Sequence, residues 1–328
     1  MTVRSASRVL AMLGLVLGLA PGLVPGTVRP AAAAAGVRVV PIAALASREA
    51  FDTILSSAVA SGEQALLVPV GLFEDPPAML ADMVSAARSR GLRVVAAVDV
   101  TRVASANEWP ASRDHVIYTH PEWLMVPREL ALELSRLDVR SPDYAGRLAR
   151  WARANAGKAM DLYLSPVHTD VAAFVAGAVR TLVERIPFDG VQFDTARYPS
   201  GDFDYSRRSL EQLRREIRPG LSPEERRRLD GIEAFDLLAY ATEFPDVWRR
   251  FRQTQLTALV VRARTAVKSV RPDAVVSAVV GSDPLASLSD YLQDWPTWLD
   301  NRFIDAVTVD ATDAPPSAVP SPAGPPGQ

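Results

Sequence analysis

The sequence feature that most constrains the fold is a regular alternation of short apolar runs with stretches of helical periodicity. Residues 37–42, 65–70 and 92–98 are short, apolar and rich in β-branched side chains, which predicts buried strands. The segments between them repeat apolar residues every three to four positions, as one-sided helices do. Asp75 and Pro76 are typical of a helix start, as N-cap and first-turn proline. Strand, helix, strand, helix, strand with short connections predicts a parallel sheet with right-handed crossovers.

The same alternation returns in the second half of the chain, after a long irregular stretch over residues 100–143. Three further runs predict strands, at residues 188–193, 275–280 and 303–309, and a weaker run does so at 161–164. Helices are expected at residues 170–183, in the charged segment 206–230, at 248–270 and around 292–299.

These runs amount to six firm strands and one weak strand in repeated βα units, which favours an α/β fold of the (β/α)8 TIM barrel type. Strands that are apolar throughout need cover on both faces, and a barrel provides it. No eighth strand follows Val309, so we expect the barrel to be incomplete at the C-terminus. A doubly wound open sheet is the alternative, although no Gly-rich phosphate loop follows the first strand.

The two ends of the chain differ from the part between them. Residues 1–35 combine early arginines, an apolar stretch and a run of small residues, which predicts a cleaved Sec-type signal peptide. Pro21 and Pro25 interrupt the apolar stretch, so we expect no stable membrane span after cleavage, with an uncleaved anchor as the alternative. Residues 36–312 form the predicted barrel domain, and 313–328 a Pro-rich disordered tail. The expected location is therefore secreted or cell envelope.

Composition removes several classes of function. The chain has 36 Lys and Arg against 38 Asp and Glu, and its net charge of −2 gives no electrostatic reason to expect nucleic acid as a partner. It contains no Cys, which excludes disulfides, thiolate metal sites and cysteine nucleophiles. Only three His are present, and no two of them share a ligand spacing, so we expect no metal and no other cofactor.

Three acidic residues directly follow predicted strands, where reactive side chains lie in a parallel barrel: Asp99, Asp194 and Asp310. Asp194 enters a loop that also holds Arg197 and Tyr198. A carboxylate there could act as a general acid, a base or a nucleophile, with Arg197 keeping it ionised. Alternatively, Asp194 could be a structural acceptor that orders the loop with Arg197. The spacing alone does not decide between these interpretations.

The segment around Asp194 carries a family resemblance. The run Phe188-Asp-Gly-Val-Gln-Phe-Asp-Thr-Ala-Arg-Tyr-Pro199 resembles the (F/Y)DG(I/V)xxDxxRYP motif of the glycosyl-hydrolase-like 10 family, the DUF187-type bacterial glycosidase-like proteins. Residues 79–98, the Trp248-Arg-Arg segment and residues 291–305 resemble the family in the same order. The resemblance covers roughly residues 37–310. It implies an exported TIM-barrel glycoside hydrolase with the motif aspartate at the active centre.

The resemblance implies a function, and the strand-end positions indicate which carboxylate could be the partner of Asp194. Glycoside hydrolysis usually needs two carboxyl groups across the scissile bond. We expect Asp194 to be one of them, and Asp99 the other, with Asp310 as the second choice for this partner. The expected function is hydrolysis of O-glycosidic bonds in an envelope or environmental polysaccharide or oligosaccharide. The family's third strand commonly ends in a His-Ala-Trp-type run, and the matching stretch here is Val95-Ala-Ala-Val-Asp99. This departure and the missing eighth strand motivate the alternative of a non-catalytic carbohydrate-binding or truncated inactive relative.

Sugar rings stack their C–H faces on aromatic side chains and bond polar ones through their hydroxyls. The candidate substrate-binding residues are Arg197, Tyr198, Trp109, Trp123, His168 and Asp294. Trp109 and Trp123 lie in the long stretch after the third strand, where a cleft wall is expected. His168 is alternatively an ordinary loop residue, and Asp294 an acid that structures the turn at the start of a helix.

Overall fold

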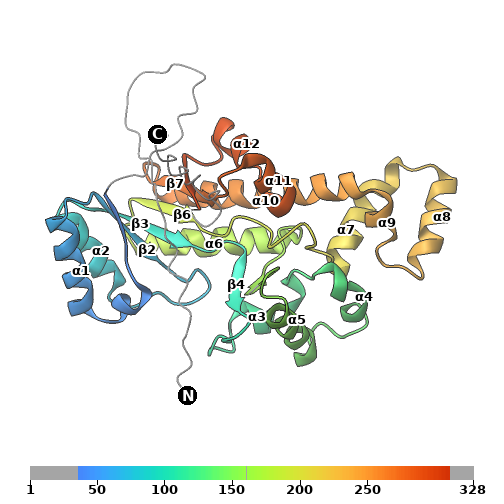
Figure 1. The fold of residues 1–328 in the computed structure, drawn as a ribbon, viewed down its shortest axis with the longest axis horizontal. Coiled ribbons are helices and arrows are strands. Elements are labelled where there is room, and N and C mark those ends of the chain that lie inside the picture. Colours follow the sequence, from blue (N-terminus) through green and yellow to red (C-terminus); the bar gives the residue numbers. More distant parts are fainter. Residues whose placement is uncertain (1–35, 160, 311–328) are drawn as a thin grey trace, which may run out of the picture.

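The computed structural model describes residues 36–159 and 161–310 of the chain (Figure 1). The signal peptide predicted for residues 1–35 and the tail predicted for 313–328 lie outside the described residues. Among those that are described, no helix combines the length and the apolar character needed to cross a membrane.

Six parallel strands form one sheet in the order β1-β2-β3-β6-β7-β8. Their bounds are Val37–Val39, Ala65–Pro69, Arg93–Val98, Gly190–Phe193, Val275–Val280 and Ala306–Val309. The order follows the chain in one direction, without the reversal that a doubly wound sheet has at its switch point. The described residues therefore form an α/β half-barrel. The predicted incomplete barrel is confirmed, and the doubly wound alternative is wrong.

The strands form where they were predicted because their apolar runs are covered on both faces. Five consecutive residues of β3 and five of β7 are buried. Alternate residues point to opposite faces. On the outer face, Val94, Ala96 and Val98 join the main hydrophobic core. On the inner face, Val95 and Ala97 form a small separate cluster with a residue of β2. Toward the carboxyl ends of the strands, the side chains on this inner face are polar.

Helices pack against the outer face. Those connected directly to the six strands are α1 (Arg48–Ala60), α2 (Leu80–Ser89), α6 (Thr169–Arg185), α10 (Pro245–Val270), α11 (Pro284–Tyr291) and α12 (Trp295–Asp300). The two long helices α6 and α10 lie side by side (Figure 1). The inward stripe of α10, which includes Leu256, Leu259 and Val260, is fully buried, as its helical periodicity predicts.

Two helix predictions need correction at their ends. Helix α2 begins at Leu80 rather than at Pro76. Pro76 precedes Pro77, and a residue before proline is sterically pushed out of the α region. The helix expected around residues 292–299 is instead the end of α11 and the separate helix α12, because Leu292 has a left-handed φ of 57° that ends α11.

The chain between β3 and β6 leaves the main sheet. It contains β4 (Arg102–Ser105), α3 (Val116–Thr119), α4 (Ala131–Leu134), α5 (Pro142–Ala154) and β5 (Asp161–Tyr163), together with the single-turn helices η2 (Pro121–Trp123) and η3 (Arg128–Leu130). Strand β5 pairs antiparallel with β4, and β3 pairs directly with β6. The weak strand predicted at residues 161–164 therefore exists but is not a barrel strand. The Asp161 carboxylate lies 3.5 Å from Arg102. In the apolar interior of a parallel sheet the charge of Asp161 would have no such partner, which disfavours that position for β5.

The charged segment expected to form surface helices does so. It contains α7 (Arg207–Ile217) and α8 (Pro223–Glu233), followed by the short α9 (Ala239–Glu243), and it projects beyond the sheet at the end of α10 (Figure 1). Ser222 and Glu225 form a capping box at the start of α8, which satisfies amide groups that the helix itself leaves free.

Candidate active site

Asp99 and Asp194 leave neighbouring parallel strands at the same level of the sheet. Val98 at the end of β3 is the register partner of Phe193 at the end of β6. The Asp194 amide continues this ladder by donating to the Val98 carbonyl oxygen at 2.8 Å. Neighbouring strands are about 4.8 Å apart, so the two carboxyl groups start from adjacent backbone positions. Both lie at the carboxyl edge of the sheet, where barrel enzymes place their active sites.

A hydrogen-bonded relay on the inner face orients Asp194. Gln192 lies two residues earlier in β6 and therefore on the same face. Its Nε2 donates to Asp194 Oδ1 at 2.8 Å, and its Oε1 accepts from the Thr308 hydroxyl of β8, also at 2.8 Å. Gln192 and Thr308 are buried. The relay fixes Gln192 so that its amide N–H group, rather than its carbonyl oxygen, faces Asp194.

Burial raises the pKa of Asp194 to about 7, and the negative charge of Asp99 contributes in the same direction. The hydrogen bond from Gln192 and the charge of Arg102 act to lower this pKa, whereas Asp310 acts to raise it. The net result is a carboxyl group that holds a proton in a substantial fraction of molecules at neutral pH. Perturbation of this size at a strand end is typical of functional carboxyl groups.

Asp99 has a different environment. Arg102 Nε lies 2.7 Å from Asp99 Oδ2, and the Thr195 hydroxyl donates to Asp99 Oδ1 at 2.9 Å. Burial alone would lower the pKa of Arg102, but the charges of Asp99 and Asp161 outweigh it and raise the pKa above its usual value. The guanidinium group is therefore a permanent positive partner for Asp99.

Asp310 follows β8 at the same edge and is buried. Its amide donates to the Val280 carbonyl oxygen at 2.8 Å, and its carboxylate lies 3.8 Å from Arg197 Nη2. The Arg197 guanidinium also lies over the ring of Tyr291, 4.8 Å from its centroid. The structure therefore brings all three predicted carboxylates to one edge, and it pairs Arg197 with Asp310.

The predicted substrate-binding aromatics occupy different environments. Trp109 is half-buried and packs against Tyr118, with ring centroids 5.8 Å apart. Trp123 is buried and stacks on His120 at 4.0 Å. Tyr198 has an exposed fraction of 0%, so its side chain presents no surface to a ligand.

The remaining two candidates have local structural partners. His168 is buried beside Trp123, and burial lowers its pKa. Asp294 is the N-cap of α12, where its carboxylate accepts from the Thr297 amide at 3.4 Å. This position agrees with the alternative interpretation of Asp294 as an acid that structures the turn at the start of a helix.

Sequence reasoning missed the groups that surround the carboxylates: Gln192, Thr308, Arg102 and Thr195. Gln192 carried a usable signal, because a polar residue inside an otherwise apolar strand, two positions before Asp194, must share its face. Arg102 carried none, since its role depends on β4 folding back beside Asp161.

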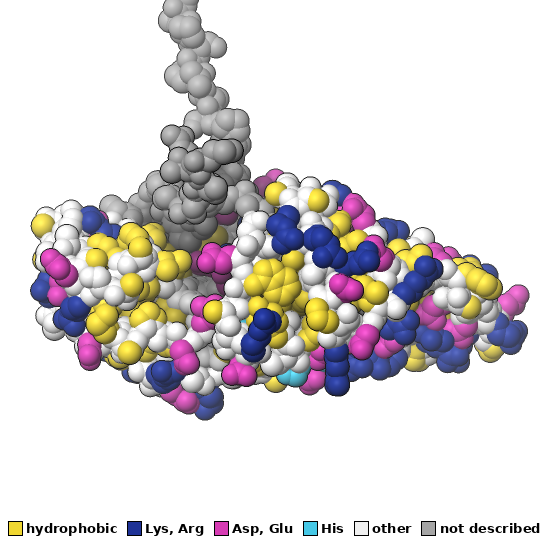
Figure 2. All heavy atoms as spheres, turned by 90° about the horizontal axis from the view of Figure 1, so that it is seen from below, with side chains coloured by type: hydrophobic (Ala, Val, Ile, Leu, Met, Phe, Trp, Pro, Cys, Tyr) yellow, Lys and Arg dark blue, Asp and Glu magenta, His cyan; other side chains and the backbone are white. Residues whose placement is uncertain are grey.

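A small cavity of about 170 Å³ lies beside Asp99 and Arg102, and residues 71–74 and His115 also line it. Figure 2 shows a hollowed face of the molecule on which acidic side chains lie between areas of hydrophobic side chains. Space for a ligand thus exists next to the charged pair.

The described residues thus form an α/β half-barrel of the TIM-barrel type with three acidic residues at its carboxyl edge. The chain belongs to the glycosyl hydrolase-like 10 family, whose sequence pattern matches residues 52–312. The family resemblance predicted from the motif around Asp194 is therefore confirmed. No curated protein matches the sequence.

Solved structures of glycosidases match this chain, and the first of those described below has a similar fold. The glycoside hydrolase domain of PgaB (BpsB) from Bordetella bronchiseptica superimposes with a TM-score of 0.50 at 15% identity, covering 84% of this chain and 73% of that one. A β-galactosidase from Marinomonas ef1 gives 0.48 at 11% identity, covering 75% of this chain and 37% of that one. An α-galactosidase from Lactobacillus brevis gives 0.40 at 11% identity, covering 74% and 26%. At these identities the PgaB match shows the fold alone.

Proposed function

We propose that this protein is an exported glycoside hydrolase that cleaves O-glycosidic bonds of an envelope or environmental polysaccharide. The observation that carries the proposal is the pairing of a protonatable Asp194 with an ion-paired Asp99 on adjacent strands. Membership of the glycosyl hydrolase-like 10 family supports it. Export rests on the composition of residues 1–35.

The two environments assign two roles. Asp194, with a pKa of about 7, donates its proton to the glycosidic oxygen as that oxygen leaves. Asp99, which is paired with Arg102 and accepts a hydrogen bond from Thr195, acts on the sugar carbon side, as base toward water or as nucleophile. Asp310 is the second candidate for the partner of Asp194.

The predicted substrate contacts divide by exposure. We propose that Arg197 and Trp109, which are both half-buried, contact the sugar. Tyr198, Trp123 and His168 are buried and act by shaping the walls around the site. Asp294 acts by fixing the start of α12.

The test compares the full-length protein with Asp194→Asn on a panel of bacterial and plant polysaccharides, by release of reducing ends. Asp273→Asn is the matched control, because Asp273 is exposed just before β7, at the opposite end of the sheet. We expect Asp194→Asn to reduce the rate about 100-fold or more, the usual contribution of a general acid, and the control to leave it unchanged. Equal hydrolysis by Asp194→Asn, or no hydrolysis by the wild type, would contradict the proposal.

One observation favours a non-catalytic, carbohydrate-binding protein as the second candidate. The small cavity at this edge is lined by Asp99 and Arg102 but not by Asp194. Polysaccharide binding that survives in Asp194→Asn, without turnover by the wild type, would select this alternative.

A further inference from the structure

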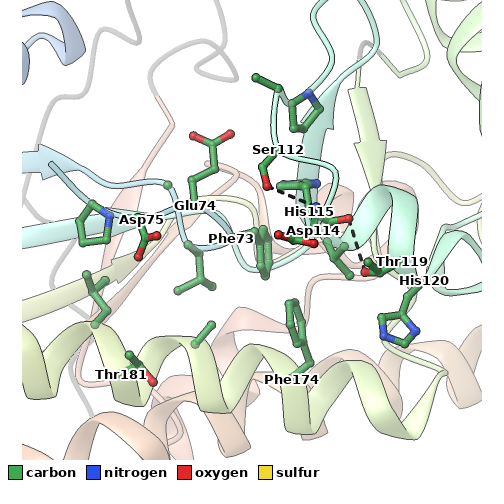
Figure 3. Close-up of a pocket in the computed structure, with 18 of the residues that line it drawn as sticks. Phe73, Glu74, Asp75, Ser112, Asp114, His115, Thr119, His120, Phe174 and Thr181 are labelled. Carbon is green, nitrogen blue, oxygen red and sulfur yellow. Dashed lines mark hydrogen bonds between the residues drawn. The ribbon is translucent and has the colours of Figure 1, made fainter.

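A second and larger cavity adjoins the one beside Asp99. Its volume is about 820 Å³, within the range of small-molecule sites. Its walls are the loop after β2, the loop that leads into α3, and one side of helix α6 (Figure 3). The two cavities share residues 71–74 and His115 in their linings, so His115 lies between the larger space and Asp99.

His115 has a buried donor without a partner. The side chain is 5% exposed, and its Nδ1 accepts from the Ile117 amide at 3.3 Å as the N-cap of α3. An Nδ1 that accepts leaves the proton of the neutral ring on Nε2. Burial lowers the pKa of His115, which favours this neutral form. Nε2 is buried and has no hydrogen-bond partner among the described residues. An unpaired buried donor is costly, and since His115 lines the cavity, a ligand acceptor that reaches Nε2 would satisfy it.

The cavity also offers a flat apolar surface. The rings of Phe73 and Phe174 stack with centroids 5.5 Å apart and an interplanar angle of 10°. Both side chains are half-buried and line the cavity, one from the loop after β2 and the other from α6 (Figure 3). Trp123 packs against Phe174 with ring centroids 5.3 Å apart, which supports the pair.

The charges around this surface select the class of ligand. The carboxylates of Glu74, Asp75 and Asp114 line the cavity, and Arg185 is paired with Asp75 at 3.2 Å. Carboxylates accept hydrogen bonds from hydroxyl groups and repel anions. An aromatic surface, a neutral donor and several acceptors together fit a ring with one apolar face and a rim of hydroxyls.

We propose that this cavity is an accessory binding site for an uncharged sugar unit of the polysaccharide, joined to the candidate active site past His115. The inference rests on the proposed function and deepens it, because it makes the substrate a chain several sugars long. Phe73 and Phe174 stack the sugar ring, and His115 Nε2 donates to one of its oxygens.

Two substitutions of His115 separate ligand binding from helix capping. In His115→Asn, the side-chain oxygen takes the place of Nδ1, so the cap is kept and the donor at Nε2 is lost. In His115→Gln, a longer amide restores a donor near Nε2 and loses the cap. A role in ligand binding predicts that Asn is the damaging change, whereas a role in capping alone predicts that Gln is.

The experiment is calorimetric titration of the full chain, carrying Asp194→Asn so that ligands stay intact. The probes are three soluble hexasaccharides: β-1,4-linked glucose, α-1,4-linked glucose and β-1,4-linked N-acetylglucosamine. We expect at least one to bind, His115→Asn to raise its Kd about tenfold, the loss expected for one buried hydrogen bond, and His115→Gln to raise it much less. Phe73→Ala should also raise it. Thermal unfolding of each variant confirms that it is folded.

The proposal is overturned if no hexasaccharide binds, or if His115→Asn binds as tightly as the parent chain. It is also overturned if His115→Asn and His115→Gln lose equal affinity. Failure of the hydrolase proposal looks different: the wild type then cleaves nothing, while binding and its dependence on His115 persist. Conversely, if hydrolysis depends on Asp194 but substitution of His115 leaves the affinity unchanged, only the accessory-site proposal is overturned.

Discussion

Asp99 and Asp194 emerge side by side from β3 and β6, and the negative charge of one contributes to the raised pKa of the other. Removing that charge should therefore lower the pKa of Asp194. We expect Asp99→Asn to shift the titration of Asp194 to below about 7, measured by carboxyl carbon NMR. Asp273→Asn serves as the control that leaves it in place. An unchanged Asp194 titration in Asp99→Asn would show that the two groups do not interact.

The raised pKa of Asp194 makes folding stability depend on pH. The pKa is about 7 in the folded state and close to 4 when unfolded, so between these values only the folded chain holds the proton. The free energy of unfolding should therefore fall as pH rises from 4 to 7, by up to about 4 kcal/mol from this group. Asp194→Asn lacks this contribution, so urea unfolding at pH 4.5 and pH 8 should differ less in the variant. Identical pH dependence in both proteins would contradict the assignment.

The relay through Gln192 should tune the same carboxyl group. Its hydrogen bond lowers the pKa of Asp194, so Gln192→Met should raise that pKa further and leave the Thr308 hydroxyl without this acceptor. Thr308→Val is the matched comparison, because it breaks the relay on the far side and keeps the bond to Asp194. NMR titration should show an upward shift in the first variant only. A shift of equal size in both would mean that packing, rather than the hydrogen bond, sets the value.

At the opposite end of the sheet, Asp305 has a structural role. Its carboxylate accepts from the Val276 amide at 2.9 Å and pairs with Arg264 and Lys268. Burial alone would raise the pKa of Asp305, but the hydrogen bonds from Lys268, Val276 and Arg264 outweigh it and lower the pKa. The stability that this group contributes is thus present above its unfolded pKa and lost as pH falls through the folded value.

Asp305→Asn should reduce the free energy of unfolding by about 1–3 kcal/mol near neutral pH, as measured by urea unfolding. The Asp194 titration should not change, because the two groups lie at opposite ends of the sheet. An Asp305→Asn variant as stable as the wild type would contradict the structural role of Asp305.

The sequence predicted the sheet well because most positions of each barrel strand are apolar. It also placed Asp99, Asp194 and Asp310 at one edge, since parallel strands end on the same side. It misplaced residues 161–163, because three residues carry too little periodicity to distinguish a barrel strand from half of an antiparallel pair.

Side-chain environments were less predictable. Tyr198 follows Arg197 in the family motif, yet one side chain is fully buried and the other is half-exposed at the edge. The cavity beside His115 could not be foreseen, because its walls come from three distant parts of the chain. Long-range packing decides these features, and no local pattern encodes it.

The Asp194 carboxyl group should keep its proton to near-neutral pH beside Asp99. Carbon NMR titration of the Asp194 carboxyl in the full-length protein, assigned with Asp194→Asn, tests it without knowledge of the substrate. We expect a midpoint of about 7. A midpoint near 4, the value of an ordinary aspartate, would contradict it.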